Sequence, residues 1–180
     1  MNNKKIKGKH LAFCALSCAL ISVGAKIQIP IFSVPFTLQM PAMLLCIFIL
    51  PAFLSTVTIG VYIFAGLLGL PVFASGGGFS YVLNPSFGYL VGFLLASLLI
   101  SLLKGKKQYK NQFVYGFLVI IVVHIFAVFY TYVISNFYIH TGLTLWQALI
   151  YSSFVFLPTD VVWCFVCSAV SHRILKAISL

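Results

Sequence analysis

The chain has 180 residues, of which 62% are hydrophobic and 7% are charged, and its formal net charge is +10 at pH 7. Soluble domains carry roughly 25% charged residues, so the composition excludes a soluble globular protein. It indicates an integral membrane protein with a single membrane domain, residues 1–180. The cations stand in short clusters at the ends of apolar runs, which favours membrane lipids over nucleic acid as their partners.

The chain begins with a basic segment that precedes an apolar run at residues 11–25. A cleaved signal peptide and a retained helix are both compatible with this order. Lys26 and several further apolar segments follow the run, which favours a retained first helix. Small residues recur on one face of that helix at three- and four-residue spacing: Ala12, Ala15, Ala19 and Ser22. Within a membrane such a face permits close approach of another helix, either of this chain or of a partner.

A helix needs about 20 apolar residues to cross a bilayer. The apolar runs predict an all-α membrane protein with six transmembrane helices, at about 10–26, 36–50, 52–68, 87–103, 112–135 and 146–172. Pro41 lies inside the second span and Pro158 inside the sixth. Because proline leaves a backbone carbonyl without its donor, we expect both spans to be kinked or broken beside a cavity.

The distribution of Lys and Arg predicts the orientation of the chain, because these residues concentrate on the cytoplasmic side. With six spans and both termini cytoplasmic, the cytoplasmic side receives Lys4, Lys5, Lys7, Lys9, Lys104, Lys106, Lys107, Lys110, Arg173 and Lys176. Lys26 alone falls on the outer side. The segments 26–35, 69–86 and 136–144 are then extracellular.

A glycine- and aromatic-rich stretch stands out between the third and fourth spans. Its candidate binding residues are Gly76, Gly77, Gly78, Phe79, Tyr81, Asn84, Phe87 and Tyr89. Glycines permit positive φ, so their N–H groups can face a ligand. The Asn84 amide offers a donor and an acceptor, and the aromatic rings offer apolar walls. A flexible outer loop is the alternative. No ATPase motif is present, so we do not expect this chain to hydrolyse ATP.

Asp160 is the only acidic residue of the chain and falls in the outer half of the sixth span. An ionisable side chain within a membrane is costly and is a candidate for function. Asp160 either contacts a ligand or has a structural partner, which would be Lys26 or the backbone near Pro158. We interpret His124 as a hydrogen-bonded packing residue. The cysteines of "CFVC" at 164–167 are interpreted as small packing residues, not as a redox or metal site.

Four segments of the chain carry a family resemblance: "ALSCA" at 15–19, "IQIPIFSVPFTLQ" at 27–39, "GVYIFAGLLGLPVFASGGGFSYVLNPSFGYLVGF" at 60–93 and "FLPTD" at 156–160. Together they resemble the BioY family, the biotin-specific S components of energy-coupling factor (ECF) vitamin transporters. The resemblance covers nearly the whole chain. It implies the six-helix S-component fold, in the cell membrane of a prokaryote, with a vitamin site on the extracellular side.

The resemblance also implies ligand and partners. Biotin's urea ring has two N–H donors and one carbonyl acceptor. The implied contacts are Asp160 as an acceptor, with Asn84, Gln39 and the glycine N–H groups as further polar candidates, and aromatic side chains against the rings and the valeryl chain. The implied protein partners are an ECF transmembrane coupling subunit, which would dock on Ala15 and Ala19, and two ATPase subunits. The chain itself would be a transport subunit without a cofactor or a metal, not an enzyme.

One position departs from the family pattern. Family members often carry a lysine three residues after the aspartate, and here that residue is Trp163. We expect Lys26 to meet the biotin carboxylate instead, while Trp163 covers the apolar chain. Alternatively, Lys26 anchors its helix at the lipid headgroups.

Three other functions compete with biotin uptake. One is an S component for another small vitamin, another is an ion- or proton-coupled carrier, and the third is a structural membrane protein. A single acid and a single mid-span histidine are poor equipment for an ion-coupled carrier. A structural protein would not need the glycine- and aromatic-rich outer segment.

Overall fold

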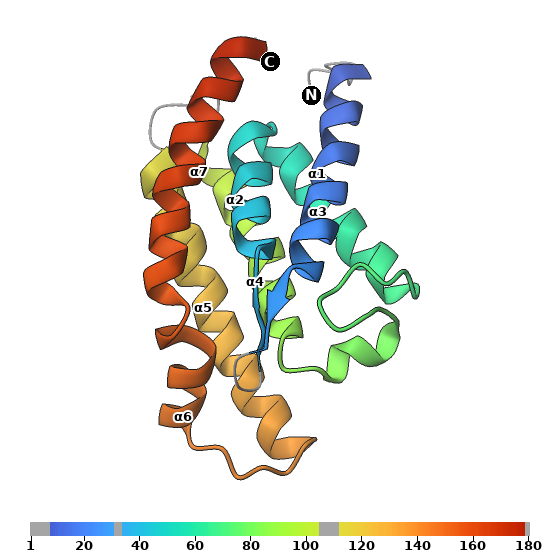
Figure 1. Ribbon diagram of the computed structural model, residues 1–180, viewed down its shortest axis with the longest axis vertical. Helices are drawn as coiled ribbons and strands as arrows, with labels where there is room; N and C mark the ends of the chain where they lie inside the picture. The colour runs from blue at the N-terminus through green and yellow to red at the C-terminus, as the bar shows by residue number, and fades with distance from the viewer. Residues whose placement is uncertain (1–7, 31–33, 105–111, 179–180) are drawn as a thin grey trace.

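The computed structural model describes residues 8–30, 34–104 and 112–178. Its long helices run side by side along the long axis of the molecule (Figure 1). In chain order they are α1 (Gly8–Lys26), α2 (Gln39–Ile49), α3 (Ala52–Leu67), α4 (Phe87–Lys104), α5 (Gln112–Phe137), the short α6 (Leu145–Leu149) and α7 (Leu157–Ile178). The predicted all-α architecture is therefore confirmed at the level of the helices.

Three helical stretches are long and apolar enough to cross a membrane: Gly8–Lys26, Gln112–Phe137 and Leu145–Ala177. Three shorter apolar helices accompany them, at Gln39–Ile49, Phe53–Leu67 and Phe87–Leu103. Many large apolar side chains of these helices face outward, among them Phe53 (70% exposed), Phe129 (63%) and Phe165 (55%). So much exposed apolar surface is unfavourable in water and suits contact with lipid.

The second span begins later than expected. Residues 36–37 form a short strand, β2 (Phe36–Thr37), which pairs antiparallel with β1 (Gln28–Ile29). The helix α2 starts only at Gln39, and Pro41 lies in its first turn, where the missing N–H is not needed. The expectation that Pro41 would kink or break a helix was therefore wrong, because the chain is still extended at Thr37, four residues before this proline.

The sixth span is broken, as expected, just before Pro158. Here α6 leads into a π-helical turn, η2 (Ile150–Phe154), and α7 starts again at Leu157. The start of α6 is fixed by a capping box, in which the Thr144 side chain accepts from the backbone N–H of Gln147 and the Gln147 side chain accepts in return from that of Thr144. The break places Asp160 in the first turn of α7.

Residues 69–86 form a tightly packed turn. Phe73 and Gly76 exchange backbone hydrogen bonds of 2.9 and 3.2 Å, and a short 3₁₀-helix, η1 (Phe79–Leu83), follows. Gly76 and Gly78 have φ values of 123° and 103°, and a Cβ on Gly77 would lie 2.1 Å from the Leu70 carbonyl oxygen. All three glycines are thus required by the backbone itself.

The C-terminal end of α1 touches the residue that precedes α2. A Cβ on Gly24 would lie 2.6 Å from the Leu38 carbonyl oxygen, and the Leu38 N–H donates to the Ile27 carbonyl at 3.2 Å. This glycine therefore permits a direct backbone contact between the two helices.

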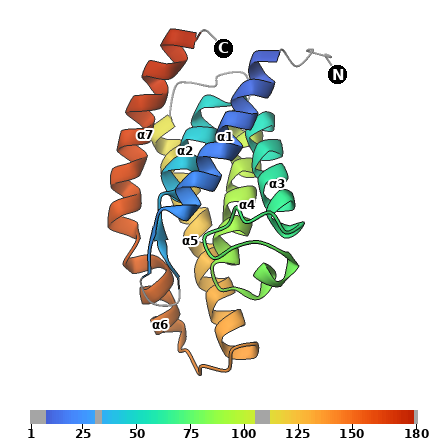
Figure 2. The same cartoon turned by 45° about the vertical axis from the view of Figure 1, so that its right-hand side comes forward.

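The start of α1 and the end of α7 lie at the same end of the molecule, and the 69–86 segment and α6 lie toward the other (Figures 1 and 2). Lys4, Lys5, Lys7, Lys106, Lys107 and Lys110, which served to orient the chain, lie outside the described residues. That the two ends share a side agrees with an even number of spans. Which side is cytoplasmic remains a prediction.

Candidate functional site

A pocket opens in the half of the molecule away from the chain ends. It is lined by Val34, Pro35, Phe36, Thr37, Gln39, Met40, Ala74, Tyr81, Ser86, Tyr89, Leu90, Phe93, Phe156 and Asp160. The pocket thus collects the β1–β2 hairpin and the N-terminal parts of α2, α4 and α7, which all begin toward this end (Figure 2). The cavity volume is about 50 Å³. One water molecule needs roughly 10–15 Å³ on the same measure, so the pocket has room for several.

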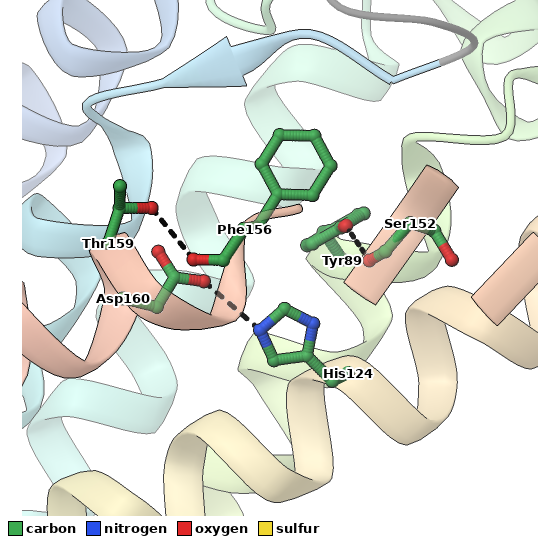
Figure 3. Close-up of polar contacts among 6 residues, drawn as sticks. All are labelled: Tyr89, His124, Ser152, Phe156, Thr159 and Asp160. Atoms are coloured by element: carbon green, nitrogen blue, oxygen red, sulfur yellow. Dashed lines mark hydrogen bonds and ion pairs between the residues drawn. The ribbon is translucent and has the colours of Figure 1, made fainter. Parts of the chain in front are cut away.

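Asp160 lies in this pocket and is hydrogen-bonded to His124 of α5. The distance from His124 Nε2 to Asp160 Oδ2 is 3.1 Å, and both residues are 5% exposed (Figure 3). Among the described residues the other carboxylate oxygen, Oδ1, has no hydrogen-bond partner. The structural partner of Asp160 is therefore His124, and neither Lys26 nor the backbone near Pro158 takes that role.

Aromatic rings form the wall beside the carboxylate. Phe156 lies parallel to Phe36 of β2, with centroids 6.2 Å apart and an interplanar angle of 6°. Tyr89 meets Phe156 edge to face at 6.3 Å and His124 edge to face at 6.1 Å. Its hydroxyl donates to the Ser152 carbonyl of η2 (Figure 3). The π-helical turn is thus tied to α4, and the Tyr89 ring is fixed as an apolar surface.

Gln39 provides a second polar group at the pocket. Its Nε2 donates to the Tyr62 hydroxyl at 3.1 Å, and that hydroxyl donates to the Val72 carbonyl at 2.9 Å. Among the described residues Gln39 Oε1 has no partner. The carboxamide therefore has an oxygen left to meet a ligand.

The 69–86 segment reaches the pocket through Ala74 and Tyr81, and Ser86 follows them at the start of α4. Gln28 of β1 donates to the Ala74 carbonyl at 3.2 Å, which ties the hairpin to this segment. Burial raises the pKa of Tyr81 above its ordinary value. At neutral pH its phenol is therefore protonated and can both donate and accept.

The structure does not bring every predicted binding residue to the pocket. It places Gln39, Tyr81, Tyr89 and Asp160 together, whereas Lys26, Gly76, Gly77, Gly78, Phe79, Asn84 and Trp163 are not among the lining residues. The N–H groups of Gly76 and Gly78 donate to carbonyls of this chain, at Phe73 and Gly66. Ligand contacts for this second group remain predictions.

The remaining members of that second group have identifiable positions. Asn84 Oδ1 accepts from the Ser86 N–H at 2.9 Å and so organises the turn before α4. Phe79 is 78% exposed. Trp163 is half-buried and packs against the core of α7 and its neighbours. Lys26 is exposed at the last turn of α1.

Sequence reasoning missed the hairpin and did not identify the partner of the histidine. Val34, Pro35, Phe36 and Thr37 line the pocket although they were assigned to a loop and the start of a span. His124 was expected to be a hydrogen-bonded packing residue, and its partner is the pocket carboxylate. The signal was available in principle, because a single acid and a single mid-span histidine in an apolar bundle are natural partners.

The described residues contain no group of three or more His, Cys, Asp or Glu side chains that could hold a metal ion. Ala15 and Ala19, the candidate docking residues, are exposed on α1, with Leu16 (63% exposed) and Leu20 (45%) beside them. No helix of this chain covers that face in the part of the molecule that is described.

The BioY family model matches residues 1–180. The chain belongs to the BioY family. Relatives include a protein named "Probable biotin transporter BioY" from Lysinibacillus sphaericus, which is 39% identical over 129 residues, 70% of this chain and 66% of that protein. "Biotin transporter BioY" from Thermotoga maritima is 34% identical over 137 residues, 73% of this chain and 77% of that protein.

The fold of this BioY family member is similar to a solved structure, described as the S-component for biotin from an ECF-type ABC transporter. The TM-score is 0.78 at 27% sequence identity, and the match covers 98% of this chain and 95% of the other. The S-component fold that the sequence motifs implied is thus supported along nearly the whole chain.

Proposed function

We propose that this chain is the biotin-binding membrane subunit of an ECF transporter, which captures biotin on the extracellular side and releases it inward. The observation that supports this most directly is the pocket itself. It lies away from the end shared by the two chain ends, and it combines a buried carboxylate with an aromatic wall. A fused ring system that bears polar N–H groups suits such a site.

In this proposal the urea ring of biotin lies at Asp160 and Gln39. The spare carboxylate oxygen of Asp160 accepts one urea N–H, and such a hydrogen bond to a charged group is stronger than a neutral one. Phe36, Tyr89 and Phe156 pack against the rings. The valeryl chain points toward the outer surface, so that its carboxylate remains near water.

The sequence contains no ATPase motif, so in this proposal ATP-driven release requires partners. We assign these roles to a transmembrane coupling subunit that docks on the exposed small-residue face of α1, at Ala15 and Ala19, and to two ATPase subunits. Close packing against small residues is a common mode of helix association in membranes. Surrounding lipids cover the remaining exposed apolar side chains.

Equilibrium binding of radiolabelled biotin to the purified protein in lipid nanodiscs tests the proposal. We expect saturable binding that unlabelled biotin abolishes and that unlabelled riboflavin or thiamine leaves unchanged. Competition by another vitamin but not by biotin would instead identify an S component with a different substrate. ATP-driven biotin uptake that persists after the collapse of ion gradients, measured in proteoliposomes that contain the full complex, would separate an S component from an ion-coupled carrier.

A further inference from the structure

Two polar side chains of the pocket, Gln39 and Asp160, are each held from behind by another buried residue. Tyr62 of α3 holds Gln39, and His124 of α5 holds Asp160. Neither Tyr62 nor His124 lines the pocket, and they are 2% and 5% exposed. Their polar atoms therefore act on the pocket only through the residues that they hold.

The Tyr62 hydroxyl fixes which way the Gln39 carboxamide faces. A phenol has one proton, and the Tyr62 proton is used on the Val72 carbonyl, which can only accept. The Tyr62 oxygen must therefore accept from Gln39, so the NH₂ group of the carboxamide points at Tyr62. The carboxamide oxygen of Gln39, Oε1, then faces the pocket. The hydrogen-bond chain from Gln39 through Tyr62 to Val72 thus fixes the orientation of the amide.

His124 has the corresponding effect on Asp160. Its Nδ1 is buried and has no hydrogen-bond partner among the described residues. A proton on Nδ1 would be a buried donor without an acceptor, so the proton belongs on Nε2 and is donated to Asp160 Oδ2. Asp160 Oδ2 then accepts this hydrogen bond, and the other oxygen, Oδ1, remains available.

We propose that Tyr62 and His124 are positioning residues that make the polar end of the pocket a pair of acceptors, Gln39 Oε1 and Asp160 Oδ1. Such a pair selects a ligand group that presents two N–H donors. The inference rests on the proposed function, because the cyclic urea of biotin is a group of this kind. A carboxamide facing the other way would favour a ligand that presents a carbonyl at the same place.

A double-mutant cycle tests the role of Tyr62. The four proteins are the wild type, Tyr62→Phe, Gln39→Met and the double variant, and the measured quantity is biotin affinity in nanodiscs. Tyr62→Phe leaves the carboxamide free to rotate, and we expect affinity to fall about three- to tenfold. In the Gln39→Met background the same substitution should have no further effect on affinity, because no carboxamide remains to be oriented.

Tyr130→Phe is the matched control. The Tyr130 hydroxyl also donates to a carbonyl of the 69–86 segment, that of Val82 at 2.6 Å, and Tyr130 does not line the pocket. Both Tyr→Phe variants remove one tie to this segment, so both should lower the thermal unfolding midpoint without ligand. Only Tyr62→Phe should show non-additivity with Gln39→Met in biotin affinity.

The possible failures can be told apart. If the wild type does not bind biotin, the proposed function is refuted and this inference with it. If the wild type binds biotin but the effects of Tyr62→Phe and Gln39→Met on affinity add, Tyr62 acts only through stability and the acceptor assignment is overturned. An equal loss of affinity in Tyr130→Phe would overturn it in the same way.

Discussion

Asp160 is the residue on which the binding proposal depends most. Asp160→Asn keeps the shape of the side chain but removes its charge and replaces one acceptor oxygen by a donor. Hydrogen bonds to charged groups contribute about 1.5–3 kcal/mol, so biotin affinity should fall about tenfold to a hundredfold or more. Isothermal titration calorimetry on the folded variant measures this directly. An unchanged dissociation constant would remove Asp160 from the site.

The role of the His124 hydrogen bond in positioning Asp160 can be tested by comparing two replacements of His124. His124→Leu removes the hydrogen bond to Asp160 Oδ2 and leaves a buried carboxylate without it, so we expect both biotin affinity and thermal stability to fall. His124→Gln can restore an N–H near the position of Nε2 and should recover much of the affinity. If the Gln variant binds biotin no better than the Leu variant, the hydrogen bond is not what positions Asp160.

A substitution at Lys26 can distinguish the two roles that the sequence left open for this residue, a contact with the biotin carboxylate and an anchor at the headgroups. It is exposed at the end of α1 and does not line the pocket. If its ammonium meets the biotin carboxylate, Lys26→Met should weaken biotin but hardly change the binding of an uncharged biotin amide. If Lys26 anchors the helix at the headgroups, the two ligands should respond equally. Competition binding with both ligands distinguishes these outcomes.

For these residues, the sequence predicted which side chains are candidates for binding better than it predicted which side chains lie next to each other. Asp160 was recognisable because it is the only acid in an apolar chain. Its pairing with His124 depends on how α5 and α7 pack, and no local pattern encodes that distance. The glycines were recognised as positions that permit positive φ, but the N–H groups of Gly76 and Gly78 donate to the carbonyls of Phe73 and Gly66, which only the folded chain reveals.

At the scale of single helices, α1 carries the predicted docking face. Replacing both Ala15 and Ala19 by Trp should prevent close approach of the coupling subunit and abolish ATP-driven biotin uptake. Biotin binding to the isolated subunit should persist, because these residues lie outside the pocket. Uptake assays in proteoliposomes that contain the full complex test this. Full uptake by the double variant would exclude this face as the docking surface.

The ends of α3 and α4 were predicted to within one residue, whereas α7 continues to Ile178, past the expected end at residue 172. The second span was predicted to start at residue 36, three residues before α2 begins. Nothing in the local sequence separates Phe36 and Thr37 from the apolar run that follows, but in the structure they pair with β1. The sixth span was expected to break near Pro158, and the structure adds a π-helical turn before it. Such a turn depends on tertiary ties, here the bond from Tyr89 to Ser152.

For the whole molecule, the sequence predicts cytoplasmic termini and an extracellular 69–86 segment. In a cysteine-free background, Ser75→Cys should react with an impermeant maleimide in intact cells, and Gln108→Cys should react only after the cells are opened. Ser75 is exposed, which makes it a suitable positive control, and Gln108 lies outside the described residues. Labelling of the Gln108→Cys variant in intact cells would show that the orientation is the opposite of the predicted one.

The backbone contact at Gly24 bears on how partner docking and ligand binding would be coupled. The helix α1, which carries the predicted docking face, touches Leu38, and the next residue, Gln39, lines the pocket. If a partner docks on α1 as proposed, we expect a displacement of this helix to shift Leu38 and, with it, Gln39 at the pocket. Coupling free energies between two sites are reciprocal. To the extent that docking lowers the affinity for biotin, bound biotin must lower the affinity for the coupling subunit by the same factor, so an empty subunit would be the one held more tightly.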